Sequence, residues 1–153
     1  MAVKEGLKES NRSINDHLLE RLKTINKEKP WYGRNIESLI AESSGHPEIM
    51  ALLQHMLVWR RYVIEALNGG RPEITLNSAA DWPDSKGLNL EEILEDFQKT
   101  FDELVIGIEK FPKEKWCEPL WHGEYHYEKL VHGLIDHDLY HTGQVVILSK
   151  MKK

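Results

Sequence analysis

Apolar residues recur at three- and four-residue steps through every long segment of this chain, and no segment sustains the two-residue alternation of a β-strand. That spacing gathers apolar side chains on one face of a helix. The sequence therefore predicts an all-α protein without a sheet. Its 153 residues fit a single domain, residues 1–153, that can bury a core without disulfide or metal support.

Four long helices are predicted, and each boundary has a chemical cause. Pro47 suits the first turn of the second helix, and Gly69-Gly70 ends that helix. Asn89 and Glu92 form a capping box that starts the third. The predicted helices run from about 2 to 27, 47 to 68, 89 to 111 and 126 to 150, with a short helical piece after Asn35 that Gly45 closes.

The connection between the second and third helices is long, about twenty residues from Gly69 to Asn89, where most connections in compact domains are far shorter. Twenty extended residues reach ~66 Å, against ~30 Å for a helix of the same number of residues. This connection can therefore return along a whole bundle. We expect a four-helix bundle in up-down-down-up order, with a long crossover between helices 2 and 3.

Two histidines stand out in the fourth helix. His137 and His141 are four residues apart, so one helical turn brings their Cβ atoms within ~5 to 6 Å. Both occupy positions where the helical pattern calls for core residues, as does His55 in the second helix. Three neutral imidazoles on two facing helices can hold one divalent metal and leave a position open for water or substrate, as catalytic sites do. Asp138, Tyr140 and Gln144 are near enough in sequence to orient an imidazole or a bound water.

Other interpretations of these histidines were weighed. A zinc-protease pattern is rejected, because Asp138 is shorter than the usual glutamate and no His, Asp, Glu or Cys follows His141 as a third ligand. A carboxylate-bridged di-iron bundle needs two Glu-x-x-His motifs, and the sequence has none. Core histidines that merely hydrogen-bond a backbone carbonyl or a tyrosine such as Tyr140 stay an open alternative.

The residues around the three histidines resemble a known family. LLQHMLVW surrounds His55, and LIDHDLYHTGQVVIL contains the histidine pair followed by Gly143-Gln144. From about Trp31 through Leu148 the chain resembles the DinB/YfiT-like superfamily of metal-dependent enzymes. The resemblance implies an up-down-down-up four-helix bundle that binds zinc, nickel or iron through residues matching His55, His137 and His141. It also implies a homodimer, and relatives that include thiol-dependent S-transferases and a thiol-dependent isomerase.

Composition narrows the partners. The net charge of -5 and a pI near 5.9 disfavour nucleic-acid binding, which needs a concentrated basic face. One cysteine, Cys117, excludes an internal disulfide, the first residues lack the apolar core of a signal peptide, and no apolar run approaches the ~20 residues of a membrane span. We expect a cytoplasmic protein with a small-molecule substrate and no nucleic-acid or membrane partner.

Two functions of different classes follow. The first is a metal-dependent enzyme, a small-thiol-dependent S-transferase or a hydrolase, with a low-molecular-weight thiol as a co-substrate. The second is a non-enzymatic helical module for dimerisation or binding, in which the histidines pack in the core or hold a closed structural metal.

Overall fold

The computed structural model describes residues 12–151 of the chain. In that part the fold is helical, and the only strand-like pairing is one isolated β-bridge between Pro119 and His126. The prediction of an all-α protein is confirmed for these residues. In chain order the elements are α1 (Ile14–Asn26), α2 (Ile36–Ala41), α3 (Pro47–Leu67), α4 (Leu90–Lys110), the 3-10 helix η1 (Lys113–Lys115) and α5 (Tyr127–Met151).

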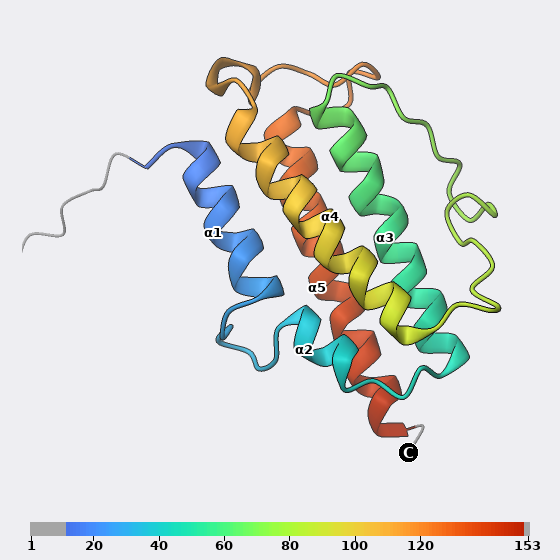
Figure 1. Cartoon of the computed structure of the whole chain (residues 1–153). Coiled ribbons are helices and arrows are strands. Elements are labelled where there is room, and N and C mark those ends of the chain that lie inside the picture. Colours follow the sequence, from blue (N-terminus) through green and yellow to red (C-terminus); the bar gives the residue numbers. More distant parts are fainter. Residues whose placement is uncertain (1–11, 152–153) are drawn as a thin grey trace, which may run out of the picture.

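The four longer helices lie side by side (Figure 1). Helices α3 and α4 run in one direction, whereas α1 and α5 run in the other. Helix α3 packs against both α4 and α5, α1 packs against the same two helices, and the short α2 covers part of α4. The irregular segment between α3 and α4 passes along the outer side of α3 (Figure 1), so the long linker lies beside the face that carries His55.

Most predicted helix boundaries are confirmed, with the expected caps. The Asn89 side chain accepts a hydrogen bond from the Glu92 backbone N–H at 2.8 Å, and the Glu92 carboxylate accepts one from the Asn89 N–H at 3.2 Å. Pro47 occupies the first position of α3, after His46 as the N-cap. These contacts satisfy backbone donors that a helix start leaves unpaired.

The predicted start of the first helix is wrong where the structure tests it. Arg12 and Ser13 precede the helix, which begins at Ile14. Ser13 and Asp16 form a capping box, in which each side chain accepts a hydrogen bond from the other residue's backbone N–H. A capping residue needs extended backbone, so the helix cannot continue through Ser13. Residues 2–11 of the predicted helix lie outside the described residues.

The role predicted for Gly45 is also wrong. Helix α2 already ends at Ala41, where the Glu42 N–H donates to the carbonyls of Ser38 and Ile40. Gly45 lies further on, in the turn that leads to α3, and adopts a φ of +68°. Glycine therefore shapes the entry to α3 rather than the end of α2.

A continuous apolar core fills the space between the helices. Its buried side chains come from all five helices and from the segment before α5, which contributes Trp116 and Leu120. The Trp116 indole N–H donates to the Asn15 side chain at 2.8 Å, and the Asn15 amide donates to the carbonyl of Ile108 at 2.7 Å. This buried asparagine joins α1, the end of α4 and the connection to α5. No helix among the described residues is long and apolar enough to cross a membrane.

Candidate metal centre

Three histidines from two neighbouring helices meet at one place. His55 lies on α3, and His137 and His141 lie one turn apart on α5. One ring nitrogen from each residue can be chosen so that all three lie within 4.8 Å of one another. His55 and His141 are buried, with 5% and 7% of their surface exposed, while the side chain of His137 is 27% exposed. The cluster is thus closed on two sides and accessible beside His137.

Asp81 from the long linker orients His55. The backbone carbonyl of Asp81 lies 2.9 Å from His55 Nδ1, and its carboxylate Oδ1 lies 3.0 Å from the same nitrogen. Both oxygens only accept, so Nδ1 carries the proton and Nε2 presents its lone pair to the cluster. The Asp81 carboxylate is held in turn by the Trp59 indole N–H at 2.9 Å and the Asn77 backbone N–H at 2.8 Å. Asn77 has a φ of +61°, a left-handed conformation that asparagine tolerates better than most residues.

Trp82, the next residue, covers the cluster. Its ring stacks on the His55 ring with centroids 3.8 Å apart and an interplanar angle of 2°. It also meets the His141 ring edge to face, at 6.2 Å and 89°. The linker therefore supplies both a hydrogen-bond partner for His55 and an apolar lid over two of the three imidazoles.

Gln144 orients His141. Its side-chain oxygen lies 2.5 Å from His141 Nδ1, so this nitrogen also donates and Nε2 is left as the free lone pair. A residue three positions along a helix lies on the same face, which explains how α5 alone can build this contact. Tyr140, the other candidate on this helix, is 68% exposed and meets the His141 ring at a centroid distance of 5.2 Å.

His137 has a different environment. Its Nε2 lies 3.0 Å from His55 Nε2, while its Nδ1 is buried without a hydrogen-bond partner among the described residues. Asp138 Oδ1 is likewise buried and unpartnered, 3.9 Å from that Nδ1. At this distance the carboxylate and the imidazole do not form a hydrogen bond.

Asp138 is fixed from its other side by a buried arginine. Arg60 Nε and Nη2 lie 2.9 and 2.8 Å from Asp138 Oδ2, and both side chains are fully buried. Arg60 also donates to the Asn26 side chain at 2.6 Å and stacks over the Phe97 ring at 4.5 Å. The pair therefore ties α3 to α5 at the residue that directly follows His137. The sequence indicated Asp138 as a residue near the site, but it did not identify Arg60 as its partner.

Burial also sets the charge of the imidazoles. Desolvation lowers the pKa of His55, and the neighbouring His137 lowers it further against the opposing effect of Asp81. Desolvation likewise lowers the pKa of His141, although its hydrogen bond with Gln144 opposes this. Both rings are therefore neutral at neutral pH, which is the form that binds metals.

The donor set fits a divalent metal. Nitrogens 2.0 to 2.1 Å from a tetrahedral zinc lie about 3.3 Å apart, close to the 3.0 Å between His55 Nε2 and His137 Nε2. Two rings already aim a lone pair inward, and the described residues offer no hydrogen-bond partner to His137 Nδ1, while its Nε2 lies against His55 Nε2. Three histidine nitrogens suit zinc, nickel or iron alike.

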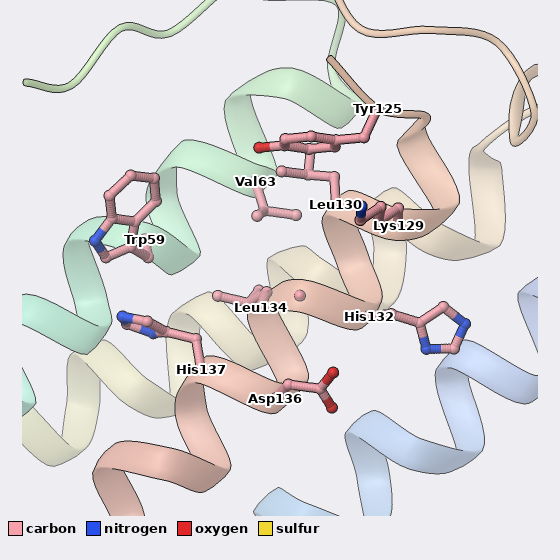
Figure 2. Close-up of a pocket in the computed structure, with 10 residues that line it drawn as sticks. Trp59, Val63, Tyr125, Lys129, Leu130, His132, Leu134, Asp136 and His137 are labelled. Atoms are coloured by element: carbon pink, nitrogen blue, oxygen red, sulfur yellow. The ribbon is translucent and has the colours of Figure 1, made fainter. Parts of the chain in front are cut away.

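A pocket of about 410 Å³ opens on the His137 side of the cluster. Figure 2 shows Trp59 and Val63 from α3 facing Leu130, Leu134 and His137 from α5, with Tyr125 at one end. Volumes of this size hold small organic ligands. The pocket and the histidine cluster share His137, so a molecule in the pocket would lie next to the cluster.

The long linker contributes residues that the sequence alone did not identify. No sequence pattern identified Asp81 or Trp82 as a residue of the site. The unusual length of the linker was the one signal in the sequence. It indicated that the linker has a functional or structural role, but it did not identify the residues involved. Comparison with protein-family models, curated proteins and solved structures found no match for this chain.

Proposed function

We propose that the chain is a metal-dependent enzyme in which His55, His137 and His141 hold one divalent metal. The observation that carries the proposal is the convergence of three imidazole nitrogens within 4.8 Å, with Nδ1 of two rings engaged by Asp81 and Gln144. Within residues 12–151 the cluster offers three protein ligands, which leaves room for a water or substrate ligand, as in catalytic zinc sites.

We further propose that the fold is an up-down-down-up four-helix bundle of the DinB/YfiT-like type. The shared direction of α3 and α4, opposite to that of α1 and α5 (Figure 1), supports this order. The linker between α3 and α4 is then the long crossover, and it carries Asp81 and Trp82 to the histidines. Under this proposal, the same bundle topology explains both the resemblance to the family and the position of the histidines.

The chain's own residues prepare the site for chemistry. Asp81 and Gln144 hold two rings in the tautomer that leaves Nε2 free, and burial keeps both rings neutral. Trp82 excludes water from one side, which strengthens electrostatic interactions in the site. The half-buried His137 leaves the pocket side open to a reactant.

A divalent metal bound here would lower the pKa of a thiol or water ligand and so supply a nucleophile near neutral pH. With a low-molecular-weight thiol as co-substrate the protein would be an S-transferase, and with water it would be a hydrolase. The three-histidine site serves either reaction, and the pocket beside His137 would receive the electrophilic small-molecule substrate.

Elemental analysis tests the proposal. Purified protein incubated with Zn²⁺ or Ni²⁺ and then desalted should retain about one metal per chain, and His141→Ala should retain none while still folding. His46→Ala is a matched control, because His46 caps α3 away from the cluster. Wild-type protein that retains no stoichiometric metal contradicts the proposal. Screens with small thiols and electrophiles then separate transfer from hydrolysis.

One observation favours the non-enzymatic alternative. The 3.0 Å between His55 Nε2 and His137 Nε2 also suits a hydrogen bond between two imidazoles. The three histidines would then be buried polar residues that hydrogen-bond one another without a metal. Under this alternative, His137→Gln should change neither the folding nor the metal content of the protein. The metal content of the wild-type protein decides between the two.

We also propose a homodimer in the cytoplasm that binds a small molecule rather than nucleic acid or membrane. The acidic net charge supports the exclusion of nucleic acid. Light scattering on the purified protein would measure the oligomeric state directly.

A further inference from the structure

A glycine forms the floor of the pocket beside His137. Gly133 lies in the interior of the 25-residue helix α5, where glycine is among the least favourable residues. A Cβ atom added at this position would meet nothing within 4 Å, so packing against a neighbour does not explain the glycine. Because Gly133 lines the pocket and has open space around the position of a Cβ, a large side chain there would compete with a ligand for that space.

Gly133 lies between two functional groups on the same stripe of α5. Lys129, Gly133 and His137 are spaced four residues apart, so they lie along one face of the helix. Eight residues of helix separate the Lys129 and His137 backbones by about 12 Å. The walls beside this stripe are mostly apolar, with Trp59 and Val63 across the pocket (Figure 2). We call this stripe and its walls the Lys129–His137 groove.

The charges at the Tyr125 end of the groove are those of Lys129, which lines it, and of Glu124, whose carboxylate adds to burial in raising the pKa of Tyr125. Lys129 forms no ion pair within the described part of the chain, and its Nζ lies 5.7 Å from the Tyr125 ring centroid. The other charged lining residue, Asp136, pairs with Arg21 at 2.9 Å, and His132 also contacts Arg21, at 2.6 Å. The groove thus presents an apolar length with a positive charge at the end far from the histidines.

We propose that the Lys129–His137 groove binds an elongated apolar molecule with one anionic end. The anionic group pairs with Lys129, the apolar body lies over Gly133 against Trp59 and Val63, and the other end reaches the histidine cluster at His137. The role of that far end as the reacting end rests on the proposed function, whereas binding in the groove does not.

Calorimetric titration with 1-octanesulfonate tests the groove. This probe has an apolar chain of suitable length and an anionic sulfonate group, which binds zinc weakly. Octyltrimethylammonium, which has the same chain and the opposite charge, is the matched probe. Titrations use the full-length zinc-incubated protein, and zinc content is measured on the same samples. Gly133→Leu fills the floor, and Lys129→Gln removes the charge. Lys150→Gln, on the same helix, is the control.

We expect the wild-type protein to bind the sulfonate more tightly than the ammonium probe. Gly133→Leu should weaken sulfonate binding about tenfold or more. Lys129→Gln should remove the preference for the anionic probe, while the affinity of the Lys150→Gln control stays within about twofold of wild type. Because the Lys129 side chain is exposed, Lys129→Gln should fold like the wild-type protein, so a changed affinity reports on the groove.

Three results would overturn the inference: no sulfonate binding, equal affinity for the two probes, or unchanged affinity in Gly133→Leu. Zinc bound without sulfonate binding contradicts the groove and leaves the proposed function standing. Sulfonate bound without any zinc contradicts the proposed function and supports the groove.

Discussion

At the residue scale, the ion pair of Arg60 and Asp138 is the electrostatic interaction on which we expect stability to depend most. Both side chains are fully buried, so neither charge is solvated by water and each depends on the other. Asn26 and the Phe97 ring complete the surroundings of the guanidinium. Because Asp138 adjoins His137 in sequence, this pair also fixes the part of α5 from which the histidines project.

Arg60→Met tests this dependence. Methionine fills the space of the aliphatic part of arginine but leaves the Asp138 carboxylate buried without its partner. We expect the free energy of unfolding to fall by about 3 to 5 kcal/mol. Arg61→Met is the matched control, because Arg61 pairs with Asp96 on the surface with both side chains about half exposed, and such pairs contribute about 0 to 1 kcal/mol. Urea denaturation measures both. Equal losses in the two variants would refute a special role for the buried pair.

At the element scale, Gly107 in α4 and Gly133 and Gly143 in α5 are glycines that a helix itself does not favour. A Cβ added to Gly133 in α5 meets nothing, whereas one added to Gly107 in α4 meets Leu67 Cδ1 at 3.3 Å. Close packing of α3 on α4 explains Gly107. No packing contact explains Gly133, which is consistent with a role in keeping the pocket open.

Alanine at these two positions should therefore have different effects on stability. Gly133→Ala is expected to raise the free energy of unfolding by up to about 1 kcal/mol, the difference in helix propensity between the two residues. Gly107→Ala should gain less or nothing, because Leu67 must move. Chemical denaturation of both variants beside wild type measures the difference. A larger gain at Gly107 would contradict the packing explanation.

At the scale of the whole molecule, the core does not depend on the histidine cluster. The apolar core extends over all five helices, and buried contacts such as the one between Asn15 and Trp116 lie far along the chain from the cluster. A bound metal should therefore add stability to a protein that already folds. This distinguishes an open catalytic site from a structural metal on which folding depends.

Removal of the metal tests this view. Adding EDTA to zinc-loaded protein should lower the melting temperature by a few degrees, as expected when a ligand that binds only the folded state is withdrawn. The helical circular dichroism at 25 °C should persist. Complete unfolding on chelation would favour a structural metal and the non-enzymatic alternative. His141→Ala is the control, since EDTA should not change its melting temperature.

Local sequence determined the helices of this protein. The predictions were wrong at the start of α1 and at the end of α2. Asn89 and Glu92 start α4 through contacts between near neighbours, and the spacing of His137 and His141 puts both on one face of α5 wherever that helix packs. The predicted start of the first helix was wrong because the capping box of Ser13 and Asp16, which are three residues apart, begins the helix at Ile14. These features are local, so they can be read from the chain itself.

Only the tertiary structure decided what surrounds the three histidines. The distance between His55 and His137 depends on how α3 packs on α5, and the positions of Asp81 and Trp82 depend on the path of an irregular linker. Arg60 became a buried partner of Asp138 for the same reason. No periodic pattern encodes a contact between residues far apart in the chain, because such contacts arise only when the packed helices bring them together.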